Sequence, residues 1–249
     1  MTPEQTLILF VAALAAGAIN SLAGGGTILS FPALVAYGLP PVEANATSMV
    51  ALWPGSLGGA WGFRREIRAI GSARWVSLGL VSLVGGLVGA FLLNSLPSRF
   101  FESIASWLIL GATILIAFDP WIRRRFSASR PAHPGAGLGL SGLFSVYGGY
   151  FGAGVGILLL PAFSLLGVRD IHEANGLKNL FMTVNKGIAA GFFIVAGLVD
   201  WRSAIVMLIG ALVGGYSAAA IGRHVPDRIM RTAIVAVGVL MFLSMLFGS

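Results

Sequence analysis

The chain has 249 residues, of which 57% are hydrophobic and only 10% carry a charged side chain. Soluble domains carry roughly 25% charged residues, so these charges are too few to cover a soluble protein of this length. The composition therefore argues against a soluble enzyme, a disordered chain and a nucleic-acid-binding protein. It predicts an all-α polytopic membrane protein.

The net charge of +7 gives no reason to expect nucleic acid as a partner. Fourteen of the sixteen basic residues are arginines, and most form short clusters between apolar runs, as in the cytoplasmic loops of membrane proteins. The sequence has no basic stripe with interleaved aromatic residues. It also has no cysteine and no metal-binding or cofactor motif, so we expect neither a metal ion nor a cofactor.

Apolar runs of about spanning length follow one another along the chain. Two further regions, 7–37 and 135–166, are apolar but interrupted by glycine, at 24–26 and within 148–154. After each interruption the apolar sequence resumes for only about a dozen residues. A helix of that length covers about 18 Å and cannot cross a hydrocarbon core of about 30 Å. The uninterrupted runs cover residues 44–62, 75–93, 102–118, 174–198, 203–221 and 232–247.

The interrupted regions belong to an internal repeat. AGGGTILSFPALVAYG (23–38) matches GAGVGILLLPAFSLLG (152–167), and Glu43-Ala44-Asn45 matches Glu173-Ala174-Asn175. We therefore divide the chain into a first membrane repeat (1–119), a basic cytoplasmic linker (120–133) and a second membrane repeat (134–249). Each repeat is expected to contain a glycine-broken helix or a re-entrant hairpin, plus three transmembrane helices.

The placement of arginine favours inverted repeats. Each repeat crosses the membrane an odd number of times, so the second repeat enters it from the opposite side. This arrangement puts twelve arginines on one side and leaves Arg99 and Arg202 on the other, in accordance with the positive-inside rule. If each hairpin were instead two full crossings, each repeat would still cross the membrane an odd number of times. The arginines therefore do not distinguish a hairpin from two crossings. We expect both chain ends to lie outside.

The two glycine breaks are candidate binding elements. A short helix begins after each break, with free N–H groups and the positive end of the helix dipole at its start. Two such helix starts at the midplane would form an anion site, and glycine permits positive φ and a close approach. The glycines at 85–89 and 210–215 are interpreted as helix-packing positions. The site residues predicted at the breaks are Gly24, Gly25, Gly26, Thr27, Gly152 and Gly154.

The two lysines of the chain lie in one apolar run, 174–198. Lys186 is about twelve residues into it, where a charge costs at least about 2.5–3.5 kcal/mol, whereas Lys178 is near enough to the start to reach the interface. Lys186 has two candidate partners: an anionic ligand, or the carboxylate of Glu43 or Glu173. Helical spacing places Asn175, Lys178, Asn179, Asn185 and Lys186 in one polar stripe, and Asn20, Asn45 and Ser48 are further candidate ligand contacts.

Two other patterns bear on the site and on the alternatives. Pro54-Gly55-Ser56 stands in the first half where Asn185-Lys186 stands in the second, and we expect it to interrupt its helix. Gly139-Leu140-Ser141-Gly142 has the GxSG form of an intramembrane serine protease. Such an enzyme needs a base, and the three histidines fall in predicted loops or at helix ends, so the enzyme is the weaker alternative.

The motifs AGGGTILSFPAL and EANATS, with the degenerate copies GAGVGILLLPAF and EANGLKN, resemble the sulfite exporter TauE/SafE family, also called the toluene sulfonate uptake permease family. The resemblance covers almost the whole chain. It implies a secondary transporter of the inner (plasma) membrane that exports sulfite, a sulfonate or a related anion, built from a duplicated four-helix unit. We expect alternating access around a midplane site, with a small anion and the bilayer as partners. An anion channel or uniporter is the alternative, and the anion, coupling to protons or other ions, and oligomeric state are left open.

Overall fold

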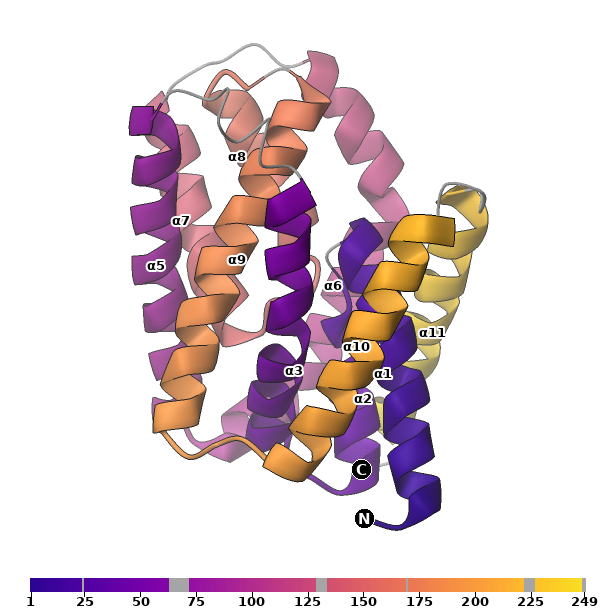
Figure 1. Ribbon diagram of the computed structural model, residues 1–249. Helices are drawn as coiled ribbons and strands as arrows, with labels where there is room; N and C mark the ends of the chain where they lie inside the picture. Colours follow the sequence, from indigo (N-terminus) through magenta and orange to yellow (C-terminus); the bar gives the residue numbers. More distant parts are fainter. Residues whose placement is uncertain (24, 63–71, 129–133, 169, 222–226, 248–249) are drawn as a thin grey trace.

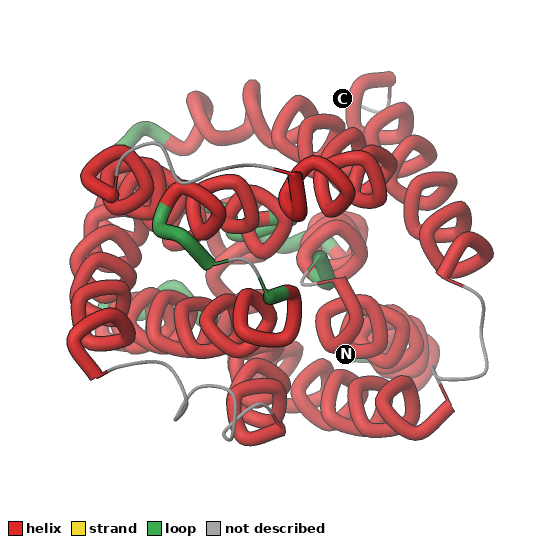
Figure 2. Tube along the Cα trace, turned by 90° about the horizontal axis from the view of Figure 1, so that it is seen from above, coloured by secondary structure: helices red, strands yellow, loops and turns green. Residues whose placement is uncertain are grey.

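The computed structural model describes residues 1–249 except 24, 63–71, 129–133, 169, 222–226 and 248–249. Within the described residues every regular element is an α-helix, and the helices form one bundle (Figure 1, Figure 2). In chain order the helices are α1 (Pro3–Ala23), α2 (Thr27–Tyr37), α3 (Pro41–Gly62), α5 (Ser72–Ser95), α6 (Ser98–Ala128), α7 (Pro134–Tyr150), α8 (Val155–Leu165), α9 (Ile171–Val195), α10 (Trp201–Ile221) and α11 (Asp227–Phe247).

The glycine breaks divide the two interrupted regions as expected. The first break separates α1, which ends at Ala23, from α2, which begins at Thr27, and the second separates α7 from α8. Both α2 and α8 have 11 residues, a length of about 16 Å or half the hydrocarbon core. α2 stops at Gly38, whose φ of 105° lies in the left-handed region that glycine adopts at little cost.

Helix α3 is continuous from Pro41 to Gly62 and contains Pro54. The expected interruption at Pro54 is therefore wrong. Proline removes one N–H from the helix, but neighbouring helices compensate for such losses inside a membrane bundle. Here α9 contacts α3 on both sides of the proline, through the indole of Trp53 and the carbonyl of Ser56.

Helices that are distant in sequence pack closely against one another. The principal neighbour of α1 is α10, and that of α5 is α7. Helix α3 packs against α9, and α6 packs against α11. A Cβ atom at Gly89 would overlap the carbonyl oxygen of Val146, and one at Gly214 would overlap that of Leu14. These contacts confirm that the glycines at 85–89 and 210–215 serve close helix packing.

The bundle is apolar outside and contains polar side chains inside. Leu80, Trp107 and Phe118 are each 58% exposed, whereas Asn45 is fully buried and Lys186 is 1% exposed. Lipid tails favour this distribution, because polar groups in hydrocarbon need partners inside the protein. The segments that are long and apolar enough to cross a membrane, within the described residues, are Pro3–Asn20, Val76–Ser95 and Ser98–Ile122.

Candidate functional site

Hydrogen bonds connect the middle of α3 to the middle of α9 at the centre of the bundle. Trp53 Nε1 donates a hydrogen bond to Thr183 O over 3.1 Å, and Thr183 Oγ1 donates to Ser56 O over 2.8 Å. A Cβ atom at Gly187 would lie 2.8 Å from Trp53 Nε1, so only glycine leaves room for the indole there. The crossing of α3 and α9 therefore has a fixed register, and it positions the next residue of interest, Lys186.

Lys186 is buried beside this crossing and reaches across to α1. Its Nζ donates to Asn20 Oδ1 over 2.9 Å. Among the described residues no carboxylate contacts the ammonium, so the alternative partners Glu43 and Glu173 are not paired with it. An ammonium has three N–H donors, and a single neutral acceptor offsets only part of the cost of burying it.

The first glycine break lies directly against Asn20. A Cβ atom at Gly26 would be 2.9 Å from Asn20 Cβ, and one at Gly25 would be 2.7 Å from Ile116 Cδ1. Gly26 has a φ of −55°, and Gly25 is not among the described glycines with positive φ. The expectation of positive φ is therefore wrong for these two positions. Glycine is needed at Gly26 because a Cβ atom there would overlap the carbonyl oxygen of Ala16, whereas at Gly25 the nearest atom is the flexible end of Ile116. Gly24 lies outside the described residues.

Helix α2 presents its first turn on the same side. Thr27 is 1% exposed, and Ser30 Oγ donates to Gly26 O while lying 2.6 Å from Ser48 Oγ on α3. A Cβ atom at Gly55 of α3 would be 3.7 Å from Asn20 Nδ2. Asn20 is therefore the point at which α1, α3, α9 and the start of α2 meet.

The second break has different surroundings. Gly152 and Gly154 have φ values of 78° and 74°, so the expected positive φ is confirmed here. Asn45 Nδ2 donates to Tyr150 O over 2.9 Å, and so α3 holds the last residue of α7. The ring of Phe151 packs edge-on against that of Phe31, with centroids 5.5 Å apart. The second break is thus embedded among aromatic rings.

The predicted polar stripe on α9 divides between three neighbours. Asn185 lies one residue from Lys186, about 100° around the helix, and its Nδ2 donates to the carbonyls of Ser82 and Ser145 at 3.2 and 2.9 Å. It ties α9 to α5 and α7. Near the start of α9, Lys178 Nζ donates to Asn175 Oδ1, over 3.2 Å.

The stem of Lys178 covers the first turn of α8. A Cβ atom at Gly156 would lie 3.1 Å from Lys178 Cδ. Asn179 Nδ2 bonds to the backbone of its own helix, at Asn175 O, over 2.9 Å. Of the predicted site residues, the structure brings together Asn20, Gly25, Gly26, Thr27, Ser48 and Lys186 near the first break, and it places Asn45, Gly152 and Gly154 at the second.

Sequence reasoning did not select Ser56, Trp53 or Thr183 as site residues. The repeat contains a signal for Ser56, because the shift of 130 positions that aligns Glu43 with Glu173 also aligns Ser56 with Lys186. Trp53 and Thr183 have no such signal, since their roles depend on how α3 and α9 cross. The clustered arginines Arg64, Arg65, Arg68, Arg130, Arg169 and Arg223 lie outside the described residues.

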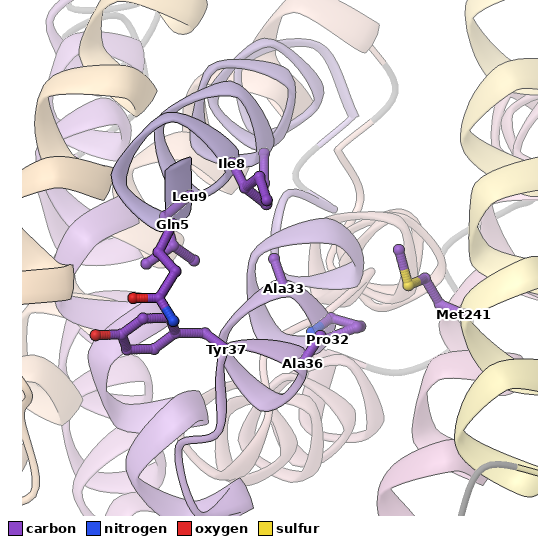
Figure 3. A pocket seen from close by; sticks show the side chains of 9 residues that line it. Gln5, Ile8, Leu9, Pro32, Ala33, Ala36, Tyr37 and Met241 are labelled. Atoms are coloured by element: carbon purple, nitrogen blue, oxygen red, sulfur yellow. The ribbon is translucent and has the colours of Figure 1, made fainter. Parts of the chain in front are cut away.

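An apolar cavity of about 340 Å³ opens elsewhere, between α1, α2 and α11 (Figure 3). Gln5 and Tyr37 lie at one side of it, Pro32 lines its middle and Met241 faces them from α11. None of the described residues that line it carries a charge, so these residues do not suit an anion.

The serine of the GxSG pattern has an internal structural partner. Ser141 Oγ donates to Gly137 O in the preceding turn of α7, over 2.8 Å. Serine hydroxyls in membrane helices commonly make this bond to their own backbone. The bond gives Ser141 a structural role in α7.

An apolar exterior, broken helices and a cation buried at the centre define a multi-pass membrane protein of the kind that moves polar solutes. The chain belongs to the sulfite exporter TauE/SafE family, whose family model matches residues 9–245. It is a membrane transporter and not an enzyme.

Curated relatives match this chain over nearly its whole length. A protein of Haemophilus influenzae described as a "probable membrane transporter protein" is 28% identical over 242 residues, which cover 96% of this chain and 94% of that protein. The "probable membrane transporter protein YfcA" of Escherichia coli is 26% identical over 250 residues, covering 100% and 92%. The similarly described YunE of Bacillus subtilis is 24% identical, covering 93% and 95%. No solved structure matches the chain significantly.

Proposed function

We propose that this chain is a secondary transporter that exports a small sulfur-containing anion, such as sulfite or a sulfonate, across the inner membrane. The observation that carries the proposal is the ammonium of Lys186, 1% exposed and bonded to the neutral oxygen of Asn20. Such a charge is too costly at this depth to be kept without a function. An anion that enters the site offsets it.

The groups around Lys186 suit a negative charge. Two N–H donors of its ammonium are left after the bond to Asn20, and the Nδ2 of Asn20 adds a donor beside Gly55. The first turn of α2, at Gly26 and Thr27, contributes backbone N–H groups and the positive end of a helix dipole. Charge-assisted hydrogen bonds of this kind are the stronger ones in proteins.

Alternating access between two inverted repeats, 1–119 and 134–249 joined by 120–133, is the mechanism we propose. The packing supports it. In chain order, α1, α3, α5 and α6 of the first repeat correspond to α7, α9, α10 and α11 of the second. Under this correspondence the α1–α10 contact matches the α5–α7 contact, and the α3–α9 and α6–α11 contacts each match themselves. The start of α1 and the end of α11 both lie toward the lower end of the bundle in Figure 1, as required if each repeat crosses the membrane an odd number of times. The repeats would then move relative to each other around the α3–α9 crossing.

Transport by purified protein in proteoliposomes tests the proposal. Uptake of labelled sulfite should saturate with sulfite concentration. Unlabelled sulfite on the opposite side of the membrane should stimulate it, and added sulfonates should inhibit it by competition. Lys186→Met should abolish it, whereas Arg202→Met, which removes an exposed positive charge from α10, should leave it intact. Sulfite flux that neither saturates nor shows stimulation from the opposite side would indicate the channel instead. Unchanged transport by Lys186→Met would overturn the assignment of the site.

Imposed gradients of protons or sodium in the same vesicles test coupling. A coupled transporter accumulates sulfite when the gradient is present and only equilibrates it when the gradient is absent. Accumulation under one gradient and not the other identifies the coupling ion.

A further inference from the structure

One serine at the α3–α9 crossing has a buried hydroxyl without a partner. Ser56 is 5% exposed, and its Oγ has no hydrogen bond among the described residues. The great majority of buried side-chain polar atoms in proteins are hydrogen-bonded, so each exception needs an explanation. A ligand that binds in the site is one explanation for an unused donor.

Ser56 lies on the turn of α3 that contacts both other components of the site. Its own carbonyl accepts the hydrogen bond from Thr183, three residues before Lys186 on α9. The residue before it, Gly55, lies against Asn20 Nδ2, and Asn20 holds the ammonium of Lys186. The hydroxyl of Ser56 thus belongs to the segment of α3 enclosed by α1 and α9.

The internal repeat leads to the same residue independently. The register that pairs Glu43-Ala44-Asn45 with Glu173-Ala174-Asn175 pairs Ser56 with Lys186. Where α9 carries an ammonium, α3 carries a hydroxyl at the equivalent place. A hydroxyl donates one directed hydrogen bond and adds no second charge, so the two halves contribute different donors to one site.

We propose that Ser56 Oγ donates a hydrogen bond to the anion that Lys186 holds, and that the site thereby takes an oxyanion in preference to a halide. This inference rests on the proposed transport function. Directed donors on two different helices can each address a separate oxygen of an oxyanion, which gives two geometrically distinct bonds. A halide has a single acceptor atom, so two donors that are directed at separate points cannot both bond to it at their best geometry.

The chain supplies a matched control. Ser203 on α10 is fully buried and its Oγ also has no partner among the described residues, but its backbone N–H bonds to Asp200, at the start of α10. Ser56→Ala and Ser203→Ala therefore remove the same group from two buried places. Ser56→Thr keeps the hydroxyl. Dissociation constants for sulfite and for chloride are measured on the purified full-length protein by titration calorimetry, with thermal unfolding as a check on folding.

Ser56→Ala should weaken sulfite binding about 10-fold or more, the usual effect of one hydrogen bond to a charged group. It should weaken chloride binding less than 3-fold, and Ser56→Thr should bind sulfite within about 3-fold of the wild type. Ser203→Ala should match the wild type. The inference is overturned if Ser56→Ala binds sulfite as the wild type does, if both alanine variants weaken it equally, or if chloride binding falls as far as sulfite binding.

Lys186→Met separates this inference from the function on which it rests. Loss of sulfite binding in Lys186→Met with normal binding in Ser56→Ala would refute only the role of Ser56. Normal sulfite binding in Lys186→Met would overturn the assignment of the site to Lys186, whereas a wild-type protein that binds no sulfite would refute the proposed function itself.

Discussion

The bond between Lys186 and Asn20 predicts an unequal effect when either partner is removed. Asn20→Leu leaves an ammonium that is 1% exposed without its acceptor, and a buried charged donor left without a partner costs about 3 kcal/mol or more. Lys186→Met leaves only a half-buried amide oxygen unpaired, at about 1–3 kcal/mol. It also removes a charge whose burial costs at least about 2.5–3.5 kcal/mol, so its two effects nearly offset each other.

Thermal unfolding of the purified protein in detergent, without added anion, measures this difference. A chain of this size shifts its Tm by about 2–4 °C per kcal/mol, so Asn20→Leu should melt at least about 6 °C below the wild type. Lys186→Met should remain within about 4 °C, and the double variant should recover most of the loss. Asn179→Leu is the control and should have a small effect, because among the described residues this half-buried amide bonds to its own helix alone.

Two results would refute this reasoning. If Lys186→Met melted well below Asn20→Leu, the ammonium would have to stabilise a partner other than Asn20, such as a carboxylate. If the double variant melted as low as Asn20→Leu, the loss would come from packing around residue 20 and not from a stranded charge.

Three further predictions concern the glycines and the topology. Gly154→Val should lose transport and about 1–3 kcal/mol of stability, because the φ of 74° at this position suits glycine. Uptake assays and the Tm measure these losses. A variant with unchanged uptake and Tm would show that the backbone at the break can adopt another conformation without cost. Gly89→Ala should lower the Tm because its Cβ atom would overlap the carbonyl oxygen of Val146. Gly79→Ala should raise the Tm slightly, because a Cβ atom there has nothing within 4 Å. Equal Tm shifts in the two variants would contradict the role of Gly89 in helix packing. Single cysteines at Ile70 and Val225, in this Cys-free chain, should be labelled from the cytoplasmic side; labelling from opposite sides would exclude inverted repeats.

Sequence patterns sufficed for the features that depend on local residues. The breaks follow from runs of glycine bounded by apolar segments, and α2 ends at Gly38 because a glycine there can adopt positive φ. The burial of Lys186 follows from its depth in an apolar run, since no side chain of that kind can remain exposed to lipid.

Features that depend on which helices meet could not be read from the sequence. Asn185 and Lys186 are adjacent and were predicted in one stripe, yet they bond to different helices because successive side chains point about 100° apart. The bond from Asn45 to Tyr150 joins residues 105 positions apart. Pro54 was expected to break α3, but contacts from α9 on both sides of it accompany a continuous helix.

The long sequence distances between packed helices have a consequence for biosynthesis. Asn20 and Lys186 are separated by 166 positions, and a ribosome adds about 5–20 residues per second, so Asn20 is synthesised roughly 8–33 s before its partner. Gly17 of α1 likewise lacks its neighbour in that interval, because Ala211 of α10, which lies against it in the complete protein, has not yet been synthesised. The face of α1 that packs against α10 is therefore without its partner until the second half is made, and the bundle is completed only when α9 and α10 have been synthesised.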